Sequence, residues 1–402
     1  MSSSGETIRV TAVAASSELG GTERVLLDFA ARAFEHDIML RVITPRPGPL
    51  LNILNDIGVP AEVVPAPPSL LRGSQRLTAL WSAPGAMVGL RTWARRLAGH
   101  PFVRDTDLWY GVSFKAYLAF PKGASTPVVW HLHEFPPALT GTAWKLLARR
   151  RPDALIANSD AVARAWGAPA PGARRARAAP PIIAIPNGVD LDRFRPRERS
   201  GWIARALGIA PTTRIIGMPA VLASWKGQLA VVDAFTRIRD RFPDVHLVFV
   251  GGSIYDTVAE RSFEGRLRTV IQRESRVHLV PFQPKIELAY PEFDLAVHYS
   301  TRAEAFGRVI IEAMASAVPV LAAAEGGPVE IVTEGGWLVE PRAPGALANA
   351  MVSALMLPPD HLRQIGHWGR IRMEDHYSAR RFARDVSRVL RATTSGVPAG
   401  PA

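Results

Sequence analysis

A glycine and two glutamates in one short segment, Glu304, Gly307 and Glu312, are the residues whose types and spacing are best suited to binding a ligand. A glycine at the start of a predicted helix lets the backbone approach a ligand closely, and the unpaired N–H groups there attract anions such as phosphate. Glu312 lies farther along the same helix, where a carboxylate accepts hydrogen bonds from vicinal hydroxyl groups such as those of ribose. Glu304 precedes the helix and reaches the opposite end of the ligand. A glutamate in a first helical turn is also an ordinary partner of the helix dipole, so this pattern alone leaves a purely structural role open.

The wider segment resembles the donor-binding region of family 4 retaining glycosyltransferases of the GT-B fold, whose hallmark is a pair of glutamates separated by seven residues. The pair here is Glu304-Ala-Phe-Gly-Arg-Val-Ile-Ile-Glu312, and Ala317-Val-Pro-Val320 and Gly326-Gly-Pro-Val-Glu330 follow in the family's order. The resemblance implies that Glu304 is a catalytic residue that positions the sugar hydroxyls and that Glu312 binds ribose. It implies further donor contacts from Ala305, Phe306, Gly307, Arg308 and Val309.

Three more segments of the second half resemble the same family. Ser224-Trp-Lys226-Gly-Gln228 is similar to its Lys-Gly motif, in which the lysine holds the donor diphosphate. A lysine suits that task because it is a compact charge on a flexible stem, although a surface lysine at a helix start is an equally ordinary feature. The resemblance makes Lys226 a catalytic and a donor-binding residue. It also places Gly251 at the mouth of the nucleotide site and Phe282 beside the base.

Segments of the first half also resemble the family, among them Trp130–Pro136, Ala157–Asp160 and Ile185–Asp190. Gly20-Gly21-Thr-Glu23 is similar to the family's N-terminal glycine loop, which faces the donor phosphate and the acceptor. His133 matches a family histidine near the donor sugar and is our third catalytic candidate. On the residues alone, a histidine satisfied at a strand end is an equally good interpretation. His131 and His133 point to the same face of a predicted strand, but without a third ligand nearby we expect no metal site.

One departure from the family pattern concerns the diphosphate. The family normally has an arginine five residues before the lysine, and this sequence has Val221 there. Losing one charge-assisted partner costs ~1.5–3 kcal/mol if nothing replaces it. Arg302 and Arg308, beside the predicted helix start, are candidates for that replacement. Ala317 and Gln283 also stand where the family usually has glycine.

Short apolar runs alternate with amphipathic helical stretches along the chain, which predicts an α/β fold. Parallel strands need crossover connections, usually helices, so this alternation indicates parallel sheets covered on both faces. Two such sets predict two Rossmann-like, doubly wound domains, and the GT-B resemblance implies that they face an interdomain cleft. The predicted strands are Ile8–Ala14, Met39–Thr44, Leu108–Gly111, Val128–His133, Ala154–Ala157, Ile182–Ile185, Arg214–Met218, Val245–Val250, His278–Val280, Leu295–His298 and Val318–Ala322.

The domain boundary is predicted where a strand runs into Asn-Gly turn chemistry and a proline-bounded charged segment. We expect an acceptor-binding domain over 1–192 and a nucleotide-sugar-binding domain over 193–377. The last helix, at about 378–393, is expected to pack back on the first domain as in similar proteins. Asp190-Leu-Asp192 has the Asp-x-Asp spacing of another glycosyltransferase fold, but its place at this boundary argues against metal binding.

Composition narrows the function classes. The 402 residues include 48 basic and 36 acidic side chains, a net charge of +12, and no cysteine, which excludes disulfides, thiolate nucleophiles and Cys-ligated metals. The polar N-terminus and the absence of a long apolar run predict a cytoplasmic protein without a transmembrane helix. Leucines and tryptophans mixed with arginines over Leu70–Arg104 suggest peripheral contact with an anionic membrane, and the alternative is a helical pair packed on the domain with solvated arginines.

The resemblance implies transfer of a sugar, with retention of configuration, from a nucleotide diphosphate sugar to a glycan, lipid-linked or small-molecule acceptor. No metal or other cofactor is expected. Val221 keeps open a GT-B pseudo-glycosyltransferase or a weakly active nucleotide-sugar-binding protein. The net charge raises nucleic-acid binding as a distant alternative, which we do not favour because no nucleic-acid motif accompanies the arginines.

Overall fold

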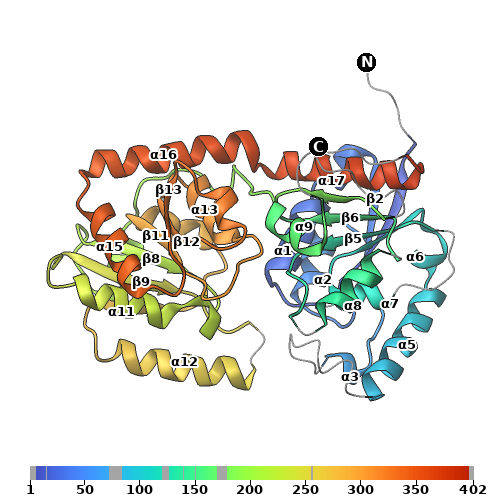
Figure 1. The fold of residues 1–402 in the computed structure, drawn as a ribbon, viewed down its shortest axis with the longest axis horizontal. Helices are drawn as coiled ribbons and strands as arrows, with labels where there is room; N and C mark the ends of the chain where they lie inside the picture. Colours follow the sequence, from blue (N-terminus) through green and yellow to red (C-terminus); the bar gives the residue numbers. More distant parts are fainter. Residues whose placement is uncertain are drawn as a thin grey trace. The chain divides into compact units, whose positions relative to one another are not determined.

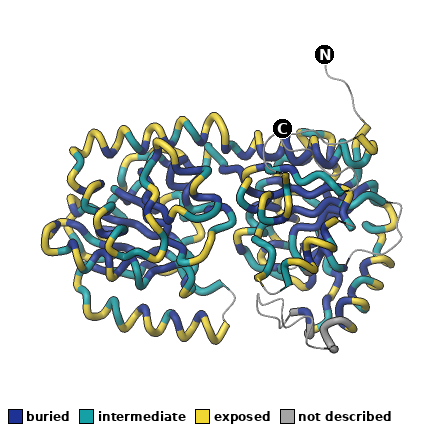
Figure 2. Tube along the Cα trace, in the orientation of Figure 1, coloured by how far each residue is buried: buried dark blue, intermediate teal, exposed yellow. Residues whose placement is uncertain are grey.

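A computed structural model describes residues 6–14, 16–71, 84–119, 126–138, 140–149, 151–169, 179–254 and 257–397. The chain divides into two compact units. The first unit contains Met1–Gly188 and Ala379–Ala402, and the second contains Val189–Ser378. The strands form the buried interior of each unit, whereas the helices carry exposed outer faces (Figures 1 and 2).

The first unit is built on a parallel sheet of seven described strands in the order β3-β2-β1-β4-β5-β6-β7. Each strand is short, and most of the strand residues are apolar, as expected of strands covered on both faces. Their bounds are β1 (Ile8–Val13), β2 (Ile38–Thr44), β3 (Ala61–Val63), β4 (Leu108–Gly111), β5 (Val128–Leu132), β6 (Ala154–Ala157) and β7 (Ile182–Ala184).

Helices cover both faces of this sheet. One face packs under α1 (Gly21–Ala30), α2 (Pro49–Asp56) and α17 (Ala379–Thr394), whose Phe382, Val386 and Leu390 join the core. The opposite face carries large aromatic side chains, and the ring of Tyr117 stacks on Trp130 at 4.7 Å. The other described helices of this unit are η1 (Ala33–His36), α3 (Pro68–Leu71), α5 (Pro84–Gly99), α6 (Pro101–Arg104), α7 (Phe114–Ala119), α8 (Gly141–Ala148) and α9 (Asp160–Trp166).

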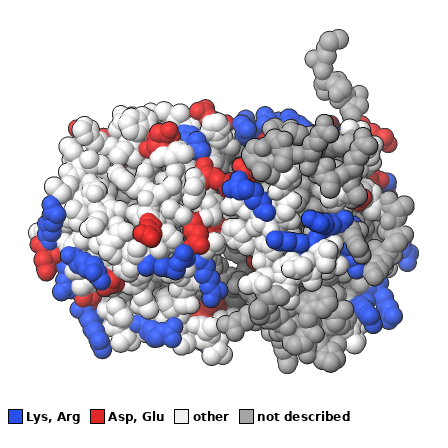
Figure 3. All heavy atoms as spheres, viewed as in Figure 1, with Lys and Arg blue, Asp and Glu red and all other residues white. Residues whose placement is uncertain are grey.

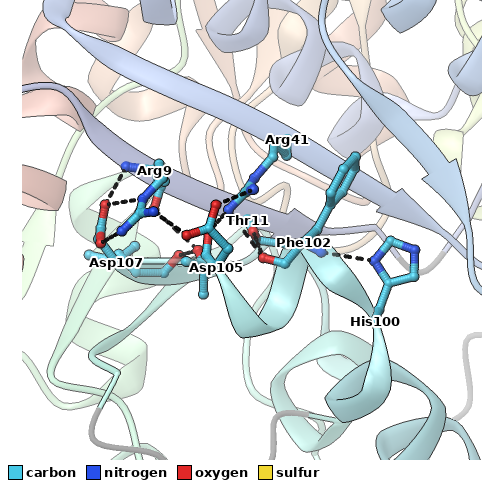
Figure 4. Close-up of polar contacts among 9 residues, drawn as sticks. Arg9, Thr11, Arg41, His100, Phe102, Asp105 and Asp107 are labelled. Carbon is cyan, nitrogen blue, oxygen red and sulfur yellow. Dashed lines mark hydrogen bonds and ion pairs between the residues drawn. The ribbon is translucent and has the colours of Figure 1, made fainter.

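An ionic cluster fixes the segment before β4 to the first two strands (Figure 4). The Arg9 guanidinium donates to Asp107 at 2.7 and 3.0 Å and also pairs with Asp105. Arg41 of β2 donates to the carbonyl oxygens of Phe102 and Asp105. The Arg9 partner holds the pKa of Asp107 below its usual value. The cluster therefore ties α6 to the sheet on the side away from the carboxyl ends of the strands. The candidate site residues follow those carboxyl ends.

The second unit is built on a parallel sheet of six described strands in the order β10-β9-β8-β11-β12-β13. Its core lies on both faces of the sheet, under α11, α12 and α15 on one side and α10, α13, α14 and α16 on the other. The strands are β8 (Arg214–Pro219), β9 (Val245–Val250), β10 (Val277–Val280), β11 (Leu295–His298), β12 (Val320–Ala323) and β13 (Gly336–Val339). The helices are α10 (Trp202–Leu207), η2 (Ser224–Lys226), α11 (Gln228–Ile238), α12 (Val258–Ile271), η3 (Ile286–Leu288), η4 (Tyr290–Glu292), α13 (Arg308–Ala315), α14 (Pro328–Ile331), α15 (Pro344–Leu355) and α16 (Pro359–His376).

The predicted two-sheet α/β architecture is confirmed, and the two sheets account for every strand that the sequence predicted. Two short edge strands, β3 and β13, were not predicted. The first has three residues with Glu62 at its centre, and the second begins at Gly336, so neither has an extended apolar run. The division at Gly188 lies a few residues before the expected boundary at 192, and α17 packs on α1, β5 and β6 of the first unit. Part of the predicted loop Gly167–Pro181, residues 170–178, lies outside the described residues.

Two histidines on adjacent strands of the second sheet are in direct contact. The Nδ1 atom of His246 lies 2.8 Å from Nε2 of His278, and the rings stack at 5.1 Å. Burial and the neighbouring His278 and Arg276 lower the pKa of His246, and burial lowers the pKa of His278. The folded protein therefore favours both rings uncharged.

This histidine pair predicts a loss of stability in mild acid. The folded-state pKa of each histidine lies below the unfolded value of 6.5, so the unfolded chain binds the proton more tightly. The free energy of unfolding is therefore highest above pH 6.5 and decreases as the pH is lowered below 6.5. Urea unfolding midpoints measured at about pH 7.5 and about pH 5.5 should differ more for the native chain than for His246→Gln/His278→Gln. Equal differences would show that the pair does not carry this linkage.

Candidate functional site

The two loops that carry Lys226 and Glu304 meet where the strand order of the second sheet reverses. In the order β10-β9-β8-β11-β12-β13, the chain proceeds outward in one direction from β8 and in the other from β11. Ligands of doubly wound sheets bind outside the carboxyl ends of the strands at such a switch point. Lys226 follows β8, and Glu304 follows β11. The topology alone therefore brings these two residues of different segments to one place.

Lys226 and Glu304 form a direct ion pair. The Nζ atom of Lys226 lies 2.7 Å from Oε2 of Glu304, and each side chain is only 14% exposed. The same ammonium group lies 4.0 Å from the centre of the Trp225 ring, a cation–π distance. The lysine is thus held by a carboxylate on one side and by an aromatic ring on another.

Two further donors converge on the Glu304 carboxylate. The hydroxyl of Ser300 donates to Oε2 at 2.9 Å, and Nε2 of His298 lies 3.1 Å from the same oxygen. Burial alone would raise the pKa of Glu304, but Lys226 and His298 outweigh it and hold that pKa well below its usual value. Glu304 is therefore an anion. Sequence reasoning missed His298 and Ser300, because nothing marks them apart from their nearness to the end of β11.

Two glycines make close loop contacts possible at this site, Gly227 beside Lys226 and Gly326 on the loop after β12. A Cβ atom on Gly227, which has φ +79°, would lie 2.0 Å from the carbonyl oxygen of Tyr299. A Cβ on Gly326, at φ +82°, would lie 2.1 Å from the carbonyl oxygen of Glu304. The N–H of Thr301 also donates to the carbonyl oxygen of Trp225 at 2.8 Å. Backbone contact between the loops thus fixes the Lys226–Glu304 pair.

The other predicted donor residues lie at the start of α13. Gly307, at φ +101°, is the N-cap, and Phe306 before it is buried. Glu312 is 7% exposed; its Oε2 accepts from the Tyr290 hydroxyl at 2.8 Å, and its Oε1 lies 3.6 Å from the Arg308 guanidinium. Val309 follows Arg308 in the first turn, and Ala305 belongs to the preceding loop. Tyr290 is a third residue that sequence reasoning missed, because it comes from η4 and not from the motif.

Gly251 and Phe282 lie on the loops that follow β9 and β10. A Cβ on Gly251 would lie 1.9 Å from the carbonyl oxygen of Ala220, so only glycine fits beside the β8 loop. Phe282 is 52% exposed, and its Cβ lies 3.5 Å from where a side chain would begin on Gly252. An exposed ring at the carboxyl edge of the sheet is free to stack on a planar group.

The remaining predicted site residues belong to the first unit. Gly20 is the N-cap of α1 and Gly21 its first residue, both after β1, whereas His133 follows β5. His133 contributes to a cavity of about 40 Å³, enough room for a few water molecules. Burial, with the nearby Glu134, raises the pKa of Glu23 in the glycine loop to about 7. The cavity is lined by Thr22, Val112, Ser113, Phe114, Tyr117, Leu132, His133, Glu134 and Trp166.

His131 has a different environment from His133. It is fully buried, and its Nδ1 lies 2.5 Å from the Tyr110 hydroxyl. Burial lowers the pKa of His131 well below its usual range. We therefore interpret His131 as an uncharged core histidine.

Two family profiles cover most of the sequence. The profile of "Glycosyltransferase Family 4" matches residues 19–193, and that of "Glycosyl transferases group 1" matches residues 203–370. The chain belongs to glycosyltransferase family 4. The first profile falls on the unit with the glycine loop and His133, and the second on the unit with Lys226, Glu304 and Glu312.

Curated relatives of this family 4 chain act on inositol-containing acceptors according to their names. It is 33% identical over 195 residues to D-inositol 3-phosphate glycosyltransferase of Segniliparus rotundus, a match that covers 47% of this chain and 42% of the relative. It is 27% identical over 221 residues to GDP-mannose-dependent monoacylated alpha-(1-6)-phosphatidylinositol monomannoside mannosyltransferase of Corynebacterium glutamicum, covering 53% and 57%. The matched part spans about half the length of these relatives.

Solved structures share the fold over nearly the whole chain. Anabaena Alr3699/HepE in complex with UDP and glucose is 25% identical, with a TM-score of 0.76 over 96% of this chain and 100% of that one. Sucrose-phosphate synthase from Thermosynechococcus elongatus is 19% identical and has the same TM-score over 97% and 100% of the two chains. The predicted GT-B fold is confirmed.

The structure shows the contacts and backbone conformation of residues that depart from the family pattern. Val221 accepts a hydrogen bond from the Gln228 side chain through its carbonyl oxygen, and its own side chain brings no charge to the β8 loop. Arg308, one proposed replacement, pairs with Glu312 on its own helix. Ala317 adopts φ +57°, a conformation that glycine takes with less strain.

The Asp190-Leu-Asp192 segment forms a turn. Oδ1 of Asp190 accepts from the backbone N–H groups of Asp192 and Arg193, both at 3.0 Å. An aspartate carboxylate that accepts from the backbone N–H groups two and three residues farther on stabilises a turn. Within the described residues, no group of three or more His, Asp or Glu side chains is arranged to hold a metal ion.

Proposed function

We propose that this chain transfers a glycosyl group from a nucleotide diphosphate sugar to a hydroxyl-bearing acceptor with retention of configuration. The observation that carries the proposal is the Lys226–Glu304 pair at the switch point, beside the N-terminus of α13. A nucleotide sugar has an anionic diphosphate next to a hydroxyl-rich ring. A lysine and backbone N–H groups suit the first, and a carboxylate suits the second.

In this proposal the residues have separate tasks. Lys226 and the N–H groups around Phe306, Gly307 and Arg308 meet the negative charge that develops on the departing diphosphate. Glu304 orients the sugar hydroxyls, and Glu312 binds ribose. Gly20, Gly21 and His133 serve the sugar and the acceptor from the first unit. No protein nucleophile is assigned, because the leaving phosphate assists deprotonation of the acceptor on the same face of the sugar.

A ligand screen should identify the donor. Thermal unfolding measured with UDP, GDP, ADP and their sugar forms should give a clear rise in melting temperature for one base. A ligand at ~100 times its Kd adds ~2.7 kcal/mol to stability. The preferred sugar nucleotide should then be consumed when an acceptor is supplied, with a product of unchanged anomeric configuration. No shift with any nucleotide would contradict the proposal.

The acceptor proposed is a glycan, a lipid-linked molecule or a small polyol. The names of the relatives, which include an inositol phosphate and a phosphatidylinositol mannoside, support a cyclic polyol or its lipid as the first compounds to test. A pseudo-glycosyltransferase remains the second candidate, on the ground that Val221 removes a cation. Donor binding without glycosyl transfer to any such acceptor would favour it.

Contact with an anionic membrane from the cytoplasmic side stays a prediction. The buried Trp93 of α5 donates from Nε1 to the carbonyl oxygen of Val64, and Leu90 and Leu97 are buried with it, which favours the packed-helix alternative. Residues 72–83 lie outside the described part of the chain, within which no helix is long and apolar enough to cross a bilayer. On the second unit, at left in Figure 3, basic and acidic side chains are interspersed.

A vesicle experiment decides this point. If the arginines of this segment contact lipid, the protein should sediment with anionic phospholipid vesicles at low salt and dissociate as salt is added, because each basic residue contributes ~1 kcal/mol near such a surface. Neutral phosphatidylcholine vesicles are the control. Equal recovery with both kinds of vesicle would exclude an electrostatic membrane contact.

A further inference from the structure

All hydrogen bonds from the described residues to the Glu304 carboxyl group end on the same oxygen, Oε2. Lys226, Ser300 and His298 lie 2.7, 2.9 and 3.1 Å from Oε2. No described residue donates to Oε1. A carboxylate held by three donors on one oxygen is fixed in orientation, and its other oxygen keeps both lone pairs for a ligand.

His298 is an unusual residue for its place in the fold. It is the last residue of β11, its backbone is in register with Ala322 of β12, and it is 4% exposed. The three residues before it, Leu295–Val297, are apolar. Its Nδ1 atom is buried and has no hydrogen-bond partner among the described residues. A buried polar ring with one nitrogen unpaired is costly, and an aliphatic residue would suit a buried strand better.

Among the described residues, the Glu304 carboxylate is the one side-chain hydrogen-bond partner of His298, and this contact offsets that cost. Because Glu304 is an anion and only accepts, the proton of a neutral His298 ring lies on Nε2. An incoming diphosphate competes with Glu304 for the Lys226 ammonium group. Position 221 is valine, so no arginine there helps to bind the diphosphate. His298 and Ser300 are then the donors that keep Oε2 in place while the lysine serves the phosphate.

We propose that His298 is a positioning residue for glycosyl transfer, holding Glu304 so that Oε1 faces the hydroxyl groups of the donor sugar. This inference rests on the proposed function, because it assigns a task to Glu304 in the same site. His298 acts through Glu304 and does not itself touch the diphosphate.

Two variants separate this role from a purely structural one. His298→Leu removes the donor and keeps an apolar strand residue, whereas His298→Gln places an amide N–H near the original Nε2. We expect His298→Leu to lower kcat about tenfold to a hundredfold, because a misplacement of about 1 Å in a catalytic arrangement can cost roughly 10²-fold. His298→Gln should recover most of that loss. The melting temperature without ligand reports any damage to the fold in either variant.

Ligand binding supplies a readout that does not need turnover. In the native chain, the sugar nucleotide that shifts the melting temperature most, among UDP-glucose, GDP-mannose and ADP-glucose, should shift it more than its nucleoside diphosphate. His298→Leu should keep the diphosphate shift and lose the extra shift due to the sugar. If His298→Leu kept both the extra shift due to the sugar and its kcat, the inference would be overturned. It would also be overturned if His298→Leu lost the nucleoside diphosphate shift to the same extent as the extra shift due to the sugar. Failure of the native chain to distinguish the two ligands would instead overturn the proposed function, and this inference with it.

Discussion

Replacement of Lys226 by alanine is expected to lower kcat/KM for the donor roughly 10²–10³-fold, the usual cost of removing one preorganised group that meets developing charge. The expectation is strong here because Val221 leaves the β8 loop without a second cation. Steady-state kinetics with the donor identified by the ligand screen provides the measurement. Lys226→Arg should recover part of the activity, since it keeps the charge and changes its shape.

Stability must be followed in the same experiment. Lys226→Ala leaves the largely buried Glu304 carboxylate with His298 and Ser300 as its only described partners, and loss of one member of a buried pair is destabilising. Melting temperature separates this effect from the catalytic one. Lys285→Ala is the matched control, because that lysine is exposed in the same unit. A fully active Lys226→Ala protein would refute the assignment of the diphosphate site.

Gly227→Ala is expected to cause the largest combined loss of stability and activity. The new Cβ would lie 2.0 Å from the carbonyl oxygen of Tyr299, in a backbone conformation of φ +79° that alanine rarely adopts. Strain and overpacking of about 1–3 kcal/mol each predict a loss of about 2–6 kcal/mol in unfolding free energy. Because relief of the clash separates the loops that carry Lys226 and Glu304, glycosyl transfer should fall to near background.

The control for Gly227→Ala is Gly208→Ala. Gly208 has a similar φ of +66°, but a Cβ there meets no atom within 4 Å. It therefore measures the cost of the left-handed conformation alone, and the difference between the two variants measures the clash. Chemical denaturation and donor turnover should be recorded for both. If the two variants were equally stable and equally active, the close contact of the two loops would contribute to neither stability nor donor turnover.

The sequence was sufficient for the fold because most strands are uniform apolar runs. Val245–Val250 and Val128–Leu132 are apolar except for one histidine each, and they contrast sharply with the amphipathic helices around them. The strands β3 and β13 were missed because strands at a sheet edge need less apolar surface, so a three-residue segment around Glu62 suffices once β2 lies beside it. Such strands are defined by their neighbours and not by their own composition.

The site was predictable only as far as its segments form a motif. Glu304, Gly307 and Glu312 belong to one loop and helix, so their spacing in the sequence is informative. His298, Ser300 and Tyr290 could not be found that way, because their contacts depend on side-chain direction at the ends of β11 and η4. The pairing of Lys226 with Glu304, which lie 78 positions apart, needs the strand order of the sheet as well as the motif.

The return of α17 to the first unit makes that unit discontinuous in the chain. Five residues of α17 complete a core whose other members are synthesised before residue 189: Phe382, Ala383, Val386, Val389 and Leu390. On the ribosome, this face of the first sheet therefore has only α1 and α2 to cover it until the whole second unit has been made. A protein shortened at Ser378 would leave the apolar surface under α17 exposed, and we expect such a protein to aggregate more readily than the full chain.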